Sequence, residues 1–127
     1  MDVYDFTGKK ILVAEDEETN FLFLKALLRR TNAELIWVKT GLQAIEAIKR
    51  DDEIKVILMD MRMPDMGGLE ASVEIKKVNP QVVIIAQTAY ALEGDRQKIM
   101  EAGCDDYVSK PISGKALLDM LNGYLKD

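Results

Sequence analysis

The chain has 127 residues, which suits one domain, and its shares of hydrophobic (48%) and charged (31%) residues provide for both a core and a hydrated surface. The net charge of −5 argues against a nucleic-acid-binding face, because phosphate backbones attract basic surfaces. Histidine is absent, so a histidine base, metal ligand or phosphate carrier is excluded. The single Cys104 excludes an internal disulfide and indicates a reducing compartment. No apolar run approaches the roughly 18 residues of a membrane span.

Apolar runs typical of β-strands alternate along the chain with patterns typical of helices. Three of the runs are apolar without alternation, as expected of parallel strands covered on both faces. Thr40 and Ser113 are placed to cap two helices, and Gly103 follows a third. Each of five predicted strands is followed by a helix. The ranges, in chain order, are 10–16, 18–30, 34–39, 41–50, 55–60, 67–77, 82–88, 91–102, 106–110 and 113–125.

Five βα units in strict alternation predict an α/β fold with an open, doubly wound, five-stranded parallel sheet and five helices on its two faces. A closed eight-stranded barrel needs about 200 residues or more and is therefore excluded. No linker, low-complexity tract or internal repeat divides the chain. We expect residues 1–127 to form a single domain.

Polar side chains stand where four of the predicted strands end. Glu15 and Asp16 end the first strand, Asp60 the third, Thr88 the fourth and Lys110 the fifth. In open α/β sheets, ligands bind beyond the carboxyl ends of the strands, so we expect these side chains to meet at one edge. Asp60 carries the most information, because a carboxylate that ends an apolar strand costs desolvation unless it is paired.

These residue types suit phosphoryl transfer to a carboxylate. Three close carboxylates raise one another's pKa values, and Mg²⁺ relieves that repulsion because it prefers oxygen ligands. Lys110 can pair with a carboxylate and later with a phosphoryl oxygen, and Thr88 adds a hydroxyl donor. Each residue alone has a simpler explanation, such as a helix cap for Glu15 and Asp16 or a solvated loop position for Lys110. Their shared location favours the catalytic interpretation.

Four segments carry a resemblance to a known family: ILVAEDEETN, ILMDMRMPDMGGLE, IIAQTAYA and DDYVSKPIS. In their order and spacing they resemble the receiver domain of bacterial two-component response regulators, from about Lys9 to Leu125. The resemblance implies the flavodoxin-like receiver fold, with strand order 2-1-3-4-5. It also implies that Asp60 is the phosphoacceptor and that Thr88 and Lys110 contact the phosphoryl group.

The resemblance further implies a Mg²⁺ site and a switch. Glu15, Asp16 and Asp60 would hold Mg²⁺ with help from the backbone carbonyl of Arg62. Thr88 and Tyr107 would be switch partners that change the surface formed by residues 91–102, 106–110 and 113–125, although a half-buried strand tyrosine is the simpler explanation of Tyr107. The peptide bond between Lys110 and Pro111 is usually cis in this family.

The partners implied by the resemblance are a histidine kinase or a histidine phosphotransfer domain, with no nucleic acid and no membrane contact by this segment; the family also allows a phosphorylation-dependent dimer. Glu15, where many receivers have Asp, favours a receiver cut from a hybrid histidine kinase, but a stand-alone regulator would look the same. We expect a cytoplasmic domain, or the cytoplasmic portion of a membrane-bound hybrid kinase. We expect a phosphoacceptor with slow self-dephosphorylation rather than an enzyme.

Three other functions are compatible with parts of this pattern. A Mg²⁺-dependent aspartyl-phosphate phosphatase usually has a general-acid Asp two positions after its nucleophile, where this chain has Arg62. A flavin- or nucleotide-binding module needs a Ser-, Thr- or Gly-rich loop after the first strand, whereas the segment EDEETN is acidic. A degenerate scaffold receiver would not be expected to keep Asp60, Thr88 and Lys110.

The first predicted helix offers a docking face. With about 100° of rotation per residue, Leu22 and Ala26 lie outside the stripe that faces the core, and receivers typically meet their histidine partners through this helix. A lone exposed Leu is the simpler interpretation. The inward stripe is predicted to contain Phe21, Phe23, Leu24, Leu27 and Leu28.

Two further residues are predicted to lengthen the lifetime of the phosphorylated form. Arg62 lies two positions after Asp60, and Tyr90 lies two after Thr88. Side chains two positions apart can lean toward the same rim, so both should overhang the phosphoryl group and crowd the water that hydrolyses it. The alternatives are that both side chains point to solvent, or that the charge of Arg62 assists hydrolysis by stabilising the transition state.

Overall fold

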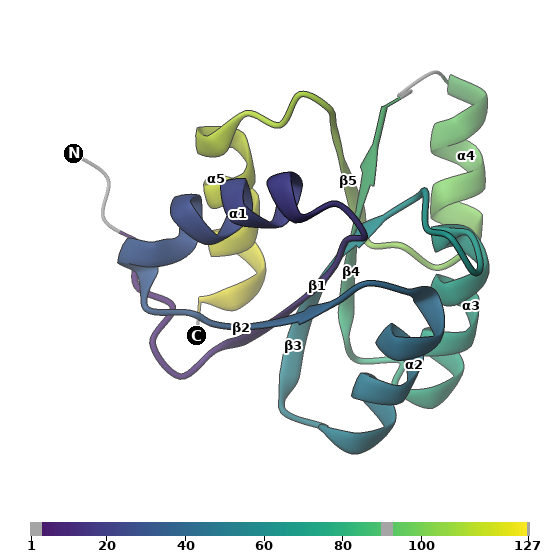
Figure 1. The fold of residues 1–127 in the computed structure, drawn as a ribbon, viewed down its shortest axis with the longest axis horizontal. Coiled ribbons are helices and arrows are strands. Elements are labelled where there is room, and N and C mark those ends of the chain that lie inside the picture. The colour runs from purple at the N-terminus through teal and green to yellow at the C-terminus, as the bar shows by residue number, and fades with distance from the viewer. Residues whose placement is uncertain (1–3, 90–92, 127) are drawn as a thin grey trace.

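The computed structural model describes residues 4–89 and 93–126. In the second range it describes side chains from residue 96 onward. The element order alternates strand and helix, as predicted, with one added 3₁₀ turn, η1 (Figure 1). The bounds are β1 Lys10–Ala14, α1 Glu18–Leu28, η1 Arg29–Thr31, β2 Glu34–Val38, α2 Gly41–Arg50, β3 Ile54–Asp60, α3 Gly68–Val78, β4 Val83–Thr88, α4 Glu93–Glu101, β5 Asp106–Ser109 and α5 Gly114–Leu125.

The five strands are parallel and lie in the order β2-β1-β3-β4-β5, so the predicted fold class and strand order are confirmed. Helices α1 and α5 cover one face of the sheet, and α2, α3 and α4 cover the other (Figure 1). This arrangement makes β3 the central strand, with β1 and β4 as its hydrogen-bonded neighbours. Asp60 therefore ends the most enclosed strand of the sheet.

Two apolar clusters fill the spaces between the sheet and its two helical layers. One contains Ile57 and Met59 of β3 and the buried residues of α2 and α3. The other contains Val56 and Leu58 and the buried residues of α1 and α5. Because successive side chains of a strand point to opposite faces, a strand buried on both sides needs an unbroken apolar run. This explains why residues 56–59 of β3 show no alternation.

Local signals predict most of the described helix ends to within one residue. Thr40 Oγ1 accepts a hydrogen bond from the Gln43 backbone N–H, and Ser113 Oγ accepts one from Ala116. Gly103 has φ +96°, a left-handed conformation that favours glycine after a helix. The predicted start of the fourth helix, at residue 91, lies outside the described residues. Among the described residues, no helix is long and apolar enough to cross a membrane.

Three sequence expectations about the first βα unit are wrong. The first strand ends at Ala14, so Glu15 and Asp16 lie in the loop beyond it, and the helix ends at Leu28 rather than at residue 30. Phe23 was expected to face the core, but it is 46% exposed. The buried residues of α1 are Phe21, Leu24 and Leu28, at a spacing that defines a narrow stripe, and a turn of about 100° per residue places Phe23 well to its side.

Candidate functional site

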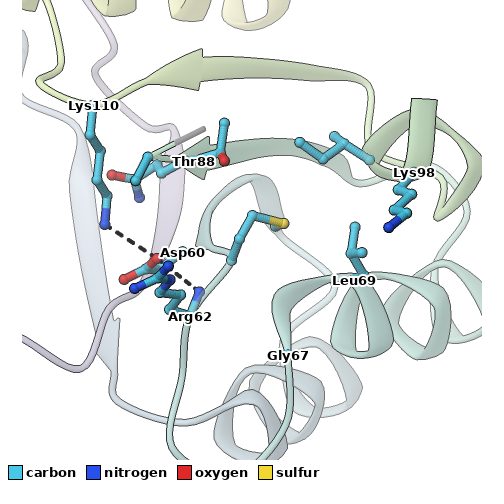
Figure 2. Close-up of a pocket in the computed structure, with 11 residues that line it drawn as sticks. Asp60, Arg62, Gly67, Leu69, Thr88, Lys98 and Lys110 are labelled. Atoms are coloured by element: carbon cyan, nitrogen blue, oxygen red, sulfur yellow. Dashed lines mark hydrogen bonds and ion pairs between the residues drawn. The ribbon is translucent and has the colours of Figure 1, made fainter. Parts of the chain in front are cut away.

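The carboxylate of Asp60 lies at the carboxyl end of β3, with a side chain that is only 5% exposed. Its Oδ1 accepts a hydrogen bond from the Arg62 backbone N–H at 3.0 Å, and the ammonium of Lys110 lies 3.3 Å from the same oxygen (Figure 2). The loop after β3 folds so tightly against Asp60 that a Cβ at Gly68 would lie 2.6 Å from the Asp60 carbonyl oxygen. The ion pair with Lys110 offsets the free-energy cost of removing the Asp60 carboxylate from water at the end of an apolar strand.

Glu15 and Asp16 lie beside Asp60, as predicted. One carboxylate oxygen from each of the three residues lies within 4.8 Å of the other two. Asp16 is exposed, whereas Glu15 is fully buried and its Oε1 has no hydrogen-bond partner among the described residues. Burial raises the pKa of Glu15 to about 7, and the neighbouring Asp60 carboxyl adds to the rise.

This donor set fits a hard divalent cation. A buried carboxylate oxygen without a partner is costly, and a cation that bridges three carboxylates would satisfy it. Mg²⁺ is bound by few protein carboxylates together with waters, which suits a cluster with one exposed member. The residues present, Glu15, Asp16 and Asp60, therefore match the metal expected from the sequence. The role of the Arg62 backbone carbonyl stays a prediction.

The backbone of Glu15 is held by β2. Its N–H donates to the Val38 carbonyl at 3.0 Å, and its carbonyl accepts a hydrogen bond from the indole Nε1 of Trp37 at 2.8 Å. The indole stacks on Phe21 of α1, with ring centroids 4.2 Å apart and planes 4° from parallel. Sequence reasoning did not assign Trp37 to the site, and a lone tryptophan in an edge strand gives no signal of this contact.

Thr88 and Lys110 are brought to Asp60 by β4 and by the chain just after β5. The Lys110 backbone N–H donates to the Thr88 carbonyl at 2.8 Å, and the Lys110–Pro111 peptide bond is cis, as predicted. Asp60, Thr88 and Lys110 all line a cavity of about 270 Å³, which Ala89 and Arg62 also border (Figure 2). The three residues expected to act at the phosphoryl group are therefore gathered around one hollow.

Tyr107 lies on β5, one strand away from Thr88. Its half-buried side chain packs against the apolar cluster on the α2–α4 face of the sheet. The guanidinium of Arg96, on α4, lies 5.4 Å from the centroid of the Tyr107 ring. This contact joins α4 to β5 across the surface that is expected to change on phosphorylation. The switch role of Thr88 and Tyr107 stays a prediction.

The structure describes both residues predicted for partner docking, but only one of the two residues predicted to lengthen the lifetime of the phosphorylated form. Leu22 is 49% exposed and Ala26 is exposed, and both border a shallow hollow between α1 and β2. Arg62 is exposed and lines the Asp60 cavity, whereas Tyr90 lies outside the described residues. The location of Arg62 is compatible with an overhanging side chain, and its effect on lifetime stays a prediction.

Comparison with known proteins agrees with this geometry. Residues 11–122 match the family model described as Response regulator receiver domain. The chain is 38% identical over 122 residues to hybrid signal transduction histidine kinase I of Dictyostelium discoideum, covering 90% of this chain but only 7% of that protein. It is 33% identical over 121 residues to the polar-differentiation response regulator DivK of Brucella ovis, covering 94% of this chain and 98% of that protein.

Solved structures give the same result. The receiver domain of the sensor histidine kinase PA1611 of Pseudomonas aeruginosa PAO1, which has a magnesium ion coordinated in its active site cleft, is 35% identical, with a TM-score of 0.86 over 95% of this chain and 100% of that one. The receiver domain of Saccharomyces cerevisiae Ssk1, in complex with the histidine phosphotransfer protein Ypd1, is matched at 27% identity, with a TM-score of 0.86 over 94% of this chain and 90% of that one.

Proposed function

The chain belongs to the family of response regulator receiver domains of two-component signalling, and from this premise we propose that Asp60 accepts a phosphoryl group from a phosphohistidine on a partner protein. The observation that carries the proposal is the surroundings of the Asp60 carboxylate. It is nearly buried, yet it borders a cavity, and it lies between the Lys110 ammonium and two further carboxylates. Such a group is held rigidly and remains reachable.

The proposed reaction is an in-line displacement at phosphorus. A carboxylate oxygen of Asp60 forms the new bond to phosphorus, the bond from phosphorus to the partner's imidazole nitrogen breaks, and the nitrogen keeps the electron pair. The Lys110 ammonium, 3.3 Å from Asp60 Oδ1, is placed to follow the charge from the carboxylate to the phosphoryl oxygens. Thr88 on the cavity wall supplies a hydroxyl donor.

Glu15, Asp16 and Asp60 are the residues that would hold Mg²⁺, and the ion would supply positive charge against the phosphoryl oxygens. This assignment is supported by the unpartnered, buried oxygen of Glu15 and by the magnesium ion in the cleft of the similar Pseudomonas receiver. The exposed Asp16 leaves one side of the cluster open to water and to an incoming donor.

The proposed output is a change of the surface formed by α4, β5 and α5. Thr88 would turn toward the phosphoryl group, and Tyr107 would move into the space that it leaves. That movement would break the contact between Tyr107 and Arg96 and so alter how α4 meets β5. Phosphorylation would thereby shift an equilibrium between two conformations, and the altered surface would recruit a partner or a second copy of the chain.

The proposed partner is a histidine kinase or a histidine phosphotransfer domain, as suggested by the complex of Ssk1 with Ypd1. Two contexts fit, since the similar chains include part of a hybrid kinase and a regulator of nearly this length. We regard the chain as a phosphoacceptor and not an enzyme with turnover. Arg62 occupies the position where an aspartyl-phosphate phosphatase would carry its general acid.

The test is intact-mass spectrometry after incubation with acetyl phosphate, with and without Mg²⁺. We expect the wild type to gain one phosphoryl group in the presence of Mg²⁺ and Asp60→Asn to gain none. Asp52→Asn is the matched control, because Asp52 is exposed and lies in the turn before β3, and it should be labelled like the wild type. ATP alone should label no variant. Equal labelling of the wild type and Asp60→Asn would contradict the assignment.

A further inference from the structure

The side chain of Gln87 is a buried polar group that the proposed reaction does not use. Gln87 lies on β4 and is 1% exposed, and neither its Oε1 nor its Nε2 has a hydrogen-bond partner in the described part of the chain. Burying an amide without partners costs free energy, so such a group calls for an explanation. Among the described residues, Glu15 is the other one with an unpartnered buried oxygen, and the cation that its cluster fits would explain it.

Gln87 lies directly beside the phosphoacceptor. It is the partner of Asp60 in the pairing of β3 with β4, and its carbonyl accepts a hydrogen bond from the Met61 backbone N–H at 3.1 Å. Since side chains alternate along a strand, Gln87 points to the same face of the sheet as Ile85, which is the face covered by α1 and α5. Thr88 points to the other face.

Gln87 and Lys110 together separate two cavities. Both residues line the Asp60 cavity, and both line a second cavity of about 320 Å³ between the start of α1 and the chain after β5. The remaining residues of the second cavity are Thr19, Asn20, Phe23, Pro111 and Ile112. Gln87 therefore lies against both cavities that flank Lys110.

We propose that Gln87 is a positioning residue for Lys110, whose amide oxygen accepts a hydrogen bond from the ammonium when Lys110 turns from Asp60 to the phosphoryl group. This inference rests on the proposed function of Asp60. An ammonium has three donors, and the phosphoryl oxygens would not engage all of them. In the resting protein Lys110 lies against Asp60 Oδ1, which leaves the Gln87 amide without a partner.

An amide suits this position better than the alternatives. A carboxylate at residue 87 would compete with Asp60 for the Lys110 ammonium and add a further negative charge beside three others. An apolar side chain, such as those that precede Gln87 on β4, would offer the ammonium no acceptor. A neutral acceptor holds the ammonium without cancelling its charge, so Lys110 can still neutralise the phosphoryl oxygens.

The first test replaces Gln87 with Met, which has similar length and no comparable acceptor, and compares it with Gln81→Met at an exposed position. Removing an unpartnered amide should raise the urea midpoint of the metal-free protein, whereas Gln81→Met should not change it. The rate of labelling by acetyl phosphate should fall about tenfold in Gln87→Met, the effect of losing one hydrogen bond to a charged group. Mg²⁺ affinity, followed by the fluorescence of the single Trp37, should stay unchanged.

A double-mutant cycle then tests whether Gln87 acts through Lys110. In a Lys110→Met background, Gln87→Met should slow labelling no further. Equal slowing in both backgrounds, or an unchanged rate in the single variant, would overturn the inference while leaving Asp60 as the acceptor. A lowered midpoint, or a failure to fold, in both Gln87→Met and Gln87→Leu would also overturn it, because the amide would then be needed in the resting fold. A wild type that is not labelled would overturn the proposed function as well.

Discussion

Glu15 shows at the scale of a single residue how burial makes cation binding depend on pH. Its carboxyl has a pKa raised to about 7 by burial and by the Asp60 carboxyl, so a Mg²⁺ ion held there would have to displace a proton in neutral solution. We expect Mg²⁺ affinity to fall by about tenfold per pH unit below that pKa, since one proton competes for the site. The measurement is a Mg²⁺ titration of Trp37 fluorescence across the neutral range.

Glu17→Gln is the control for this titration, because Glu17 neighbours Glu15 but is exposed and lies outside the acidic cluster. It should keep the pH dependence, and a Mg²⁺ affinity that is flat with pH would contradict the expectation.

Without metal, the Glu15 carboxyl affects folding stability in the opposite direction, so that a rise in pH lowers the stability. The folded pKa of Glu15 exceeds its ordinary value of 4.5, so its contribution to folding is fully present below 4.5 and is lost as the pH rises through about 7.

The role of a single residue could be predicted from the sequence where a charged side chain stands in an apolar segment. Asp60 is conspicuous because a charge that ends an apolar strand needs a partner, and the order of the strands brings Lys110 to it. Gln87 and Trp37 were missed, because a polar residue in a strand does not reveal whether it has a partner until the neighbouring elements are in place. Phe23 was misplaced, since the width of the stripe that α1 buries depends on how closely the helix packs on the sheet.

The start of α2 is joined to the loop after β3, which follows Asp60, by one carboxylate. The two oxygens of Asp65, in the loop after β3, accept hydrogen bonds from the backbone N–H groups of Gly41 and Leu42, each at 2.9 Å. Burial opposes ionisation of this carboxyl, but hydrogen bonds from backbone N–H groups, those of Leu42 and Gly41 foremost, hold its pKa below the usual range. Asp65 therefore caps a helix that is distant from it in sequence.

Asp65→Ala should destabilise the protein by ~1 kcal/mol, the usual cost of losing such a cap, as measured by urea unfolding at neutral pH. Because the folded pKa is lowered, this contribution is present above the ordinary value of 3.8 and is lost as the pH falls through the folded value. The variant and the wild type should converge in acid. Asp52→Ala, at an exposed turn position, should cost little, and an equal loss in both variants would argue against the cap.

At the scale of elements, the sequence predicted type and order better than boundaries. Apolar runs and caps are local signals, so α2 begins and ends where expected. The end of α1 depends on tertiary structure instead. Residues Arg29–Thr31 tighten into a 3₁₀ turn, and Asn32 adopts a left-handed φ of 65° that redirects the chain into β2. The tether from Asp65 could not be foreseen either, because an Asp after Pro64 indicates a turn in any loop.

For the whole molecule, the prediction concerns how a partner approaches. Leu22 projects from α1 with 49% of its surface exposed, and Lys25 and Ala26 lie beside it around the same hollow. If the histidine partner docks there, Leu22→Asp should slow transfer from a cognate phosphohistidine domain by roughly tenfold or more, because burying a new charge in an interface is costly. Labelling by acetyl phosphate should stay unchanged, since the small donor needs no docking.

The matched control is Val73→Asp, a change of the same kind at a residue of α3 that is 40% exposed. It should leave transfer from both donors unchanged. Both rates can be read from the same intact-mass time course, with the phosphohistidine domain or acetyl phosphate supplied separately. If Leu22→Asp slows the two donors equally, its effect lies in the fold of the receiver and not in docking.

Because the site is assembled at the ends of four strands, phosphorylation of Asp60 would report whether a molecule is folded. Lys110 and Asp60 are separated by 50 positions in the chain, and Glu15 lies after the first strand, far from both in sequence. Only the complete sheet therefore brings the three residues together. An unfolded chain has carboxylates but no arrangement that activates one of them. A brief pulse of acetyl phosphate at increasing urea concentrations would therefore mark native molecules and leave unfolded ones unmarked. The labelled fraction in the mass spectrum then gives the fraction of molecules that were folded at each urea concentration.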